Sequence, residues 1–328
     1  VAFLLSILAA GATANFMLYT RTNYIPVIMI WVLSAFAYFY AFFNAPFDAV
    51  AALDWVKRNR VELLSVAIVA LIAAALRFYR LGEIPRVLDG DEGRIGFIAQ
   101  TTTSGLLANP FALWENFGAI YLQLINLSMR FFGVNAFALR LLPAIGGVLA
   151  IPSVYLFARW IGGQRIALIT IIILAFSHSH IHFSRIVSVA YIHGIWLAPL
   201  ELYLLISGLE KRESWRTALS GILVAMHFSV YLTAQVILGL ALIYMLIAFL
   251  FYRPWFKTRL SQAAVFCGGF LCTIPPAAYY IFRFPNDFFN RLGEAGTFQS
   301  GWLELTMELT GQSAIEVMFG RFVHAFLS

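Results

Sequence analysis

The sequence predicts an all-α membrane protein, a polytopic bundle of about nine transmembrane helices with one long loop outside the membrane. Of its 328 residues, 61% are hydrophobic and 12% are charged, and the mean hydropathy is +0.83. Soluble domains carry about a quarter of charged residues, so water cannot solvate this much apolar surface. The bilayer must therefore surround most of the helix faces.

Apolar runs long enough to cross a bilayer recur along the whole chain. They cover residues 1–19, 24–43, 61–79, 141–159, 165–183, 190–209, 216–233, 234–252 and 260–282, and a tenth begins near Ser313. Val1 opens directly into the first run without a basic segment before it. We therefore expect no cleavable signal peptide, and we expect further residues to precede Val1.

Basic residues gather in alternate short loops between these runs, and the net charge is +6. The loops lie at residues 54–60, 159–165, 211–216 and 253–259, and they contain all three lysines, Lys57, Lys211 and Lys257. By the positive-inside tendency this side is cytoplasmic. The pattern predicts contact with anionic membrane lipids and no nucleic-acid partner. It also predicts two parts: residues 1–60, with two extra N-terminal helices and a basic loop, and a transmembrane core at residues 61–328.

The long segment from Arg80 to Arg140 is placed on the opposite, outer side by the same alternation. Its apolar stretch Phe117–Phe132 is better explained as an amphipathic helix on the outer leaflet than as a span. If it crossed the membrane, the basic loop at residues 159–165 would lie outside. As a surface helix, it would carry Gln123, Asn126 and Arg130 on one side.

Three carboxylates lie together at the start of the outer loop, in Asp89-Gly90-Asp91-Glu92-Gly93. The two glycines permit tight turns around them. The acids could bind a divalent metal, or one of them could act as a base on an acceptor hydroxyl or amine. Alternatively, this is a solvated loop in which an aspartate caps a helix that follows.

A second polar cluster, residues 177–185, lies at the outer end of a span and contains His178, His180 and His182. His178 and His182 are four residues apart, so a helix would place them on one face, where they could bind zinc. Interfacial histidines meeting lipid headgroups are the favoured interpretation. Arg185 beside them suits bidentate binding of a phosphate.

Arginines recur at the outer ends of the spans, where the positive-inside tendency disfavours them. Their recurrence predicts an anionic ligand such as a lipid-linked phosphate. They are Arg80, Arg86, Arg94, Arg140, Arg185, Arg283 and Arg291. Glu201 lies in the middle of a predicted span, which makes it a functional candidate. Cys267 and Cys272 are five residues apart in one apolar run, so we expect no disulfide between them.

The order of these features resembles the glycosyltransferase C superfamily, in particular its protein O-mannosyltransferase and aminoarabinose-transferase branch. The resemblance covers residues 76–291. The Asp91-Glu92 pair, the interfacial helix, the block Arg140-Leu141-Leu142-Pro143 and the block Phe183-Ser184-Arg185 carry it. It implies transfer of a sugar from a polyprenyl-phosphate donor to an acceptor at the extracytoplasmic face of a membrane, which we expect to be a bacterial plasma membrane.

Roles for individual residues follow from the resemblance. It implies that Asp91 is the catalytic carboxylate and that Glu92 holds the loop or a divalent cation. It implies that Arg140 and Arg185 neutralise the donor phosphate. Arg94 is a further candidate for binding this phosphate, and Asp89, His180 and His193 are other candidate site residues.

The sequence departs from the family pattern in three places. Residues 186–192 contain no acid where many relatives have one, and His193 stands nearby. The interfacial helix is preceded by Trp114-Glu115-Asn116 instead of a basic proline motif, and the chain stops at Ser328 where relatives continue. A non-catalytic structural subunit of a larger membrane complex is therefore the alternative function. A secondary transporter is less favoured, because we find no internal repeat.

Overall fold

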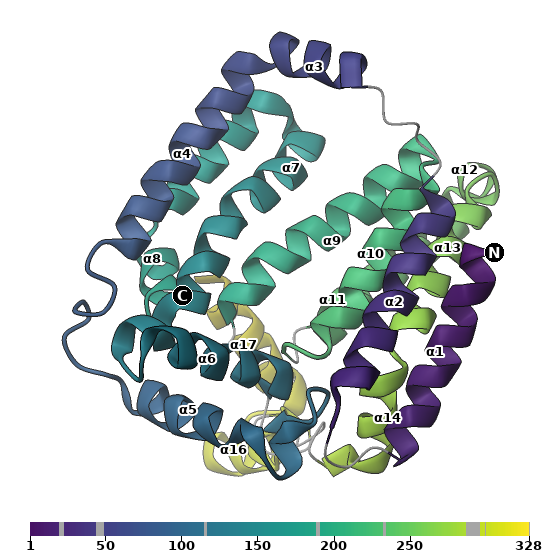
Figure 1. Cartoon of the computed structure of the whole chain (residues 1–328). Coiled ribbons are helices and arrows are strands. Elements are labelled where there is room, and N and C mark those ends of the chain that lie inside the picture. Colours follow the sequence, from purple (N-terminus) through teal and green to yellow (C-terminus); the bar gives the residue numbers. More distant parts are fainter. Residues whose placement is uncertain are drawn as a thin grey trace.

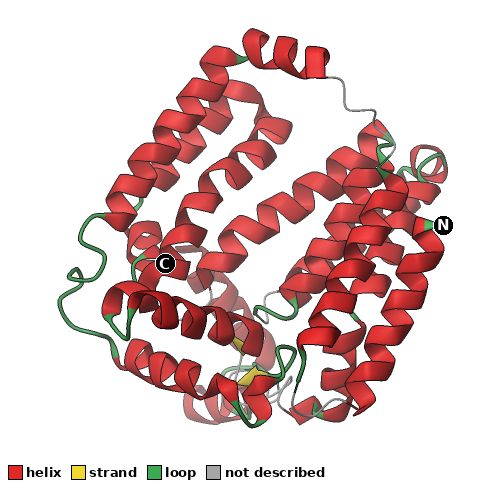
Figure 2. Cartoon of the chain, in the orientation of Figure 1, coloured by secondary structure: helices red, strands yellow, loops and turns green. Residues whose placement is uncertain are grey.

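The computed structural model describes residues 1–19, 23–43, 49–114, 117–187, 191–231, 234–286, 296–298 and 300–327. Helices make up most of this part of the chain (Figure 2). The strands described there are β1 (Leu113–Trp114) and β2 (Phe117–Gly118), which form a short antiparallel pair. The prediction of an all-α membrane bundle is confirmed.

Five helices of the described chain are long and apolar enough to cross a membrane. They are α2 (Ile25–Phe42), α4 (Arg60–Phe78), α7 (Ala136–Phe176), α9 (Tyr191–Lys211) and α11 (Ala234–Phe251). A sixth arises if α13 (Leu260–Thr273) and α14 (Pro275–Arg283) count together, although they are bent by 61°. The predicted run 260–282 breaks here because Pro275 lacks a backbone N–H and starts a new helix.

Helix α7 contains two predicted spans, which meet at Gly163. Gly163 has φ 79° and ψ 178°, a backbone conformation that favours glycine. Ile151 and Tyr155 before it pack in one core cluster with Ala167 and Ile171 after it, so the two halves fold back on one another. The second half ends at Phe176, because Ser177 is extended and accepts the N–H of His180 to begin α8 (His178–Ser184). The predicted span 165–183 is therefore two helices.

Helix α1 (Ala2–Tyr19) agrees with the predicted run 1–19. Helix α10 (Ser214–His227) ends before the predicted run 216–233 does, so that span was predicted too long. The α17 helix follows Ser313, as the tenth run predicted, over 14 residues. The bounds are α1 (Ala2–Tyr19), α3 (Ala49–Arg58), α10 (Ser214–His227), α12 (Arg253–Lys257), α16 (Trp302–Thr310) and α17 (Ala314–Leu327).

The bundle has two distinct ends (Figure 1). The basic end carries α3, α12 and the turn between α9 and α10. The loop end carries α8 and the segment 79–135, which contains α5 (Gly90–Gln100), η1 (Thr101–Thr103), η2 (Leu106–Ala108) and α6 (Ala119–Phe132). Helix α6 runs across the direction of α4 and buries Leu122, Ile125 and Met129 against Ile95 of α5. Its 14 residues and its direction agree with the predicted interfacial helix.

The first two helices form a hairpin that packs on α13. Trp31 of α2 donates its indole N–H to the carbonyl of Thr273 at 2.6 Å, and Tyr38 donates its hydroxyl to Val265 at 2.9 Å. Ser34 donates to the carbonyls of Ser6 and Cys272. Cys267 and Cys272 are both free thiols, as the sequence predicted. These contacts tie the hairpin to a helix that lies more than 200 positions later in the chain.

Candidate functional site

The centre of the loop end is a fully buried ion pair between Glu92 of α5 and Arg140 of α7. Arg140 donates Nε–H to Oε1 at 2.9 Å and Nη2–H to Oε2 at 2.8 Å, which is a two-pronged arrangement. Glu92 also accepts the backbone N–H groups of Val187 at 3.1 Å and Asp89 at 3.3 Å. Both of its oxygens therefore have two donors.

The guanidinium of Arg140 has an acceptor for each of its five N–H groups. Besides the two bonds to Glu92, it donates to the backbone carbonyls of Leu81 at 3.3 Å, Pro85 at 2.9 Å and Val87 at 3.5 Å. Such complete pairing is what keeps a buried charge tolerable. Arg140 consequently has no donor left for a phosphate in this arrangement, which differs from the role that the resemblance implied.

Arg185 follows α8 and contacts the same loop from its other side. It donates to the carbonyls of Leu76 at 2.6 Å, Arg77 at 3.1 Å, Tyr79 at 2.7 Å and Ile84 at 2.9 Å. Burial lowers its pKa, and the nearby charge of Arg140 lowers it further. The partners found for its guanidinium are carbonyls, so its positive charge is not cancelled by a carboxylate contact.

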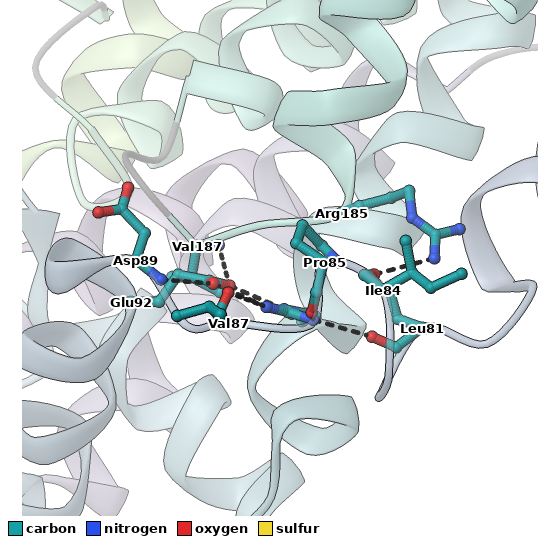
Figure 3. Close-up of polar contacts among 9 residues, drawn as sticks. Leu81, Ile84, Pro85, Val87, Asp89, Glu92, Arg185 and Val187 are labelled. Carbon is teal, nitrogen blue, oxygen red and sulfur yellow. Dashed lines mark hydrogen bonds and ion pairs between the residues drawn. The ribbon is translucent and has the colours of Figure 1, made fainter.

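The two arginines together hold the loop of residues 81–87. Figure 3 shows Leu81, Ile84, Pro85 and Val87 lying between Glu92 and Arg185. The loop has no regular ladder of its own to satisfy its carbonyls, so the guanidinium groups supply the donors. Through Glu92, the same network fixes the first turn of α5.

Asp91 lies in that first turn and is exposed to solvent. Its carboxylate is 3.9 Å from the guanidinium of Arg94, which in turn lies over the ring of Trp114, 5.0 Å from the centroid. Asp89, the residue before α5, is also exposed, and it forms a capping box with Glu92 at the start of the helix. The three acids therefore separate into one buried anchor and two exposed carboxylates.

A metal site built on Asp91 and Glu92 does not fit this geometry. Both oxygens of Glu92 are bound by N–H donors, so they do not face a cation. Within the described ranges, no three His, Cys, Asp or Glu side chains converge on one point. His178 and His182 are exposed with stacked rings 6.3 Å apart, and no third ligand of these types joins them in that part of the chain.

A cavity of about 300 Å³ opens beside Arg185. His178 and His182 line one side of it, and Tyr79 and Ile84 line another. Its walls combine two imidazoles and a guanidinium with apolar side chains. Such a surface is suited to an anionic group that is attached to a hydrocarbon.

The other candidate histidines are buried behind this surface. His180 accepts from Nη2 of Arg77 at 2.5 Å through Nδ1, which requires a neutral imidazole. His193 accepts the indole N–H of Trp196 at 3.2 Å and packs edge-on against Tyr121. These contacts hold both rings inside the bundle. The two histidines therefore do not share the exposed surface on which Asp91 lies.

A second buried pair joins Glu201 of α9 to His227 of α10. Of these two residues, only Glu201 was predicted from the sequence. Nδ1 of His227 is 3.2 Å from Oε1 of Glu201, and both side chains are buried. The predicted candidate Glu201 thus has a partner across the bundle. His227 was missed, as was Arg77, although each is an ionisable residue inside or at the end of an apolar run, which is the signal that should have identified it.

The remaining arginines of the loop end lie apart from this network. Arg80 pairs with Glu83, and Arg86 and Arg283 are exposed. Arg291 lies outside the described residues. Of the outer arginines that recur in the sequence, the ones that hold the 81–87 loop in the described part of the chain are Arg140 and Arg185.

Comparison with known proteins adds one family match. The sequence model of the dolichyl-phosphate-mannose-protein mannosyltransferase family matches residues 119–279. No curated protein matches the chain. Among solved structures, it is similar to the Archaeoglobus fulgidus oligosaccharyltransferase tethered with an acceptor peptide containing the NVT sequon, at 19% identity and a TM-score of 0.46. The match covers 79% of this chain, which spans 38% of that protein.

The family match extends from α6 to α14 and includes Arg140 and Arg185, whereas Asp91 and Glu92 precede it. It supports a membrane glycosyltransferase in general terms. The resemblance to the glycosyltransferase C superfamily that the sequence motifs indicated is confirmed by this match to the mannosyltransferase family over residues 119–279.

Proposed function

We propose that the protein is a membrane glycosyltransferase that moves a sugar from a polyprenyl-phosphate donor to an acceptor at the extracytoplasmic face. The mannosyltransferase family match carries this proposal. The exposed carboxylate of Asp91, on a helix whose first turn is fixed by Glu92 and Arg140, supports it. The basic end would be cytoplasmic by the positive-inside tendency, so the loop end would face outward.

In this proposal, Asp91 accepts the proton of the acceptor as it attacks the anomeric carbon. Glu92 and Arg140 act as positioning residues, because their atoms are committed to one another and to the loop. Arg185 keeps an uncancelled positive charge beside the 300 Å³ cavity, where it would stabilise the phosphate leaving group electrostatically. The apolar walls of that cavity would hold the first isoprene units of the donor.

One observation favours the second candidate, a non-catalytic subunit of a membrane complex. All five N–H groups of Arg140 and four donors of Arg185 are used inside the protein. A site that has lost its donor could retain both arginines for folding alone. In that case the apolar helix faces would bury partner chains.

The deciding experiment is a transfer assay on the purified protein with polyprenyl-phosphate mannose and a mixture of peptide and glycan acceptors, with products detected by mass spectrometry. We expect wild-type protein to release the polyprenyl phosphate and Asp91→Asn to lose at least about a hundredfold in rate. Asp89→Asn is the matched control, because asparagine caps a helix as well as aspartate. No transfer, together with stable co-purification of other membrane chains, would favour the subunit.

A further inference from the structure

A second cavity, of about 370 Å³, lies between the N-terminal hairpin and the loop end. Asn23, Tyr24 and Ile28 line it from the start of α2, and Gln123, Asn126 and Arg130 line it from α6. Thr102 and Thr103 of η1 complete the wall. The volume lies within the roughly 300–1,000 Å³ range of small-molecule sites.

The hairpin is packed firmly enough to form one wall. Met17 of α1 and Val27 and Trp31 of α2 make a buried cluster with Phe111 of the loop end, and Ile120 of α6 packs against it. Trp31 and Phe111 meet edge to face with ring centroids 5.1 Å apart. The two helices that precede the transferase-like core thus bring Asn23 and Tyr24 to the loop end.

Hydrogen bonds fix the polar groups on the α6 wall. Gln123 donates its amide to the carbonyls of Leu107 at 2.8 Å and Ala108 at 3.1 Å. Asn126, which is more than nine-tenths buried, donates to the hydroxyl of Thr102 at 3.1 Å. Both amide N–H donors of Gln123 and one of the two of Asn126 are thus used inside the protein, so these residues offer a ligand mainly their amide oxygens, which are acceptors.

Arg130 adds hydrogen-bond donors and a positive charge to this wall of acceptors. Its guanidinium is exposed in the last turn of α6 and offers N–H donors only. None of the described residues that line the cavity carries a carboxylate. Fixed acceptors beside an arginine match a ligand with hydroxyl groups, which both donate and accept, and with an anionic group.

We propose that this cavity binds an anionic carbohydrate and serves as an acceptor subsite, an inference that rests on the proposed function. Helix α5 joins the cavity to Asp91, since η1 directly follows its last residue. At 1.5 Å per residue, the 11 residues from Asp91 to Thr102 correspond to about 16 Å. The acceptor would therefore be an oligosaccharide, with one anionic unit at Arg130 and the reacting hydroxyl at Asp91.

The test is saturation-transfer NMR on the full chain in detergent micelles with glucuronic acid, and with glucose as the neutral match. We expect glucuronic acid to bind wild-type protein and Arg130→Gln to weaken it about tenfold, or about 1.4 kcal/mol. Arg86→Gln, another exposed arginine of the loop end, is the control and should bind as wild type does. Asp91→Asn should also bind normally, which separates this test from the transfer assay.

Three results would overturn the proposal. Wild-type protein that does not bind glucuronic acid would remove the site. Equal binding by the Arg130→Gln and wild-type proteins would move the contact elsewhere. Loss of the glucuronic acid signal on addition of phosphatidylglycerol, but not of phosphatidylcholine, would identify a lipid headgroup as the occupant.

Discussion

Arginines serve opposite purposes at the two ends of the bundle. At the loop end, Arg140 and Arg185 are buried and donate to backbone carbonyls. At the basic end, the guanidinium of Arg253 is exposed and lies over the ring of Phe249, 5.4 Å from its centroid. The position of an arginine near a membrane surface therefore does not show whether its charge contacts the protein or faces solvent and lipid.

The energetic consequences differ in the same way. Removing a buried guanidinium leaves its acceptors without donors in a dry environment, which costs the full desolvation of each group. At an exposed position of the basic end such as Arg253, water and lipid headgroups replace the lost contacts. The loop end is therefore expected to be sensitive to substitution, and the basic end tolerant.

The largest effect is expected from Arg140→Gln. It leaves the buried carboxylate of Glu92 without its counter-ion, so we expect the free energy of unfolding to fall by about 3–5 kcal/mol. Thermal unfolding in detergent at several denaturant concentrations measures this. The double variant Glu92→Gln/Arg140→Gln should recover part of the loss. A single variant as stable as Arg253→Gln would contradict the comparison.

A smaller effect is expected from Arg185→Lys. Lysine keeps the positive charge but cannot reach the carbonyls of Leu76, Tyr79 and Ile84 together, because its three donors share one nitrogen. We expect a loss of about 2 kcal/mol, in the range of a charged hydrogen bond. If donor-lipid binding were abolished while the free energy of unfolding stayed unchanged, Arg185 would bind the ligand and would not stabilise the loop.

The smallest effect is expected from Arg253→Gln at the basic end. It removes the contact with the Phe249 ring, worth about 0.5–1 kcal/mol. Arg253→Lys should retain part of it, because lysine also interacts with aromatic faces. Unfolding measured as for Arg140→Gln gives the value, and a loss above about 3 kcal/mol would erase the difference between the two ends.

Periodicity and charge in the sequence predicted much of the architecture. The apolar runs predicted the positions of α2, α4, α9 and α11. The alternation of basic loops correctly predicted that α6 is not a transmembrane helix. The breaks inside long runs were less visible, because Ser177 and Pro275 stand in otherwise apolar stretches. Residue composition within a run gives its average burial, whereas a break depends on one backbone position.

The sequence predicted the individual residues of the candidate site but not how their side chains pair in space. Glu92 and Arg140 are 48 positions apart, and nothing in their local sequences shows that they pair. The alternative interpretation, in which an aspartate caps a helix that follows, is confirmed, because Asp89 is the N-cap of α5. The cavity between α2 and α6 depends on packing of the N-terminal hairpin against Phe111, a contact between distant segments that no local pattern predicts.

The most direct test of the account compares Asp91→Asn with its neighbour Glu92→Gln in one preparation, with melting temperature and rate of sugar transfer measured on the same samples. In the proposed function, Asp91 carries out the chemistry and Glu92 positions the helix that bears it. We expect Asp91→Asn to keep the wild-type melting temperature and to lose at least about a hundredfold in rate. We expect Glu92→Gln to melt at a clearly lower temperature. An Asp91→Asn protein that transfers sugar within a few-fold of the wild-type rate would contradict these roles.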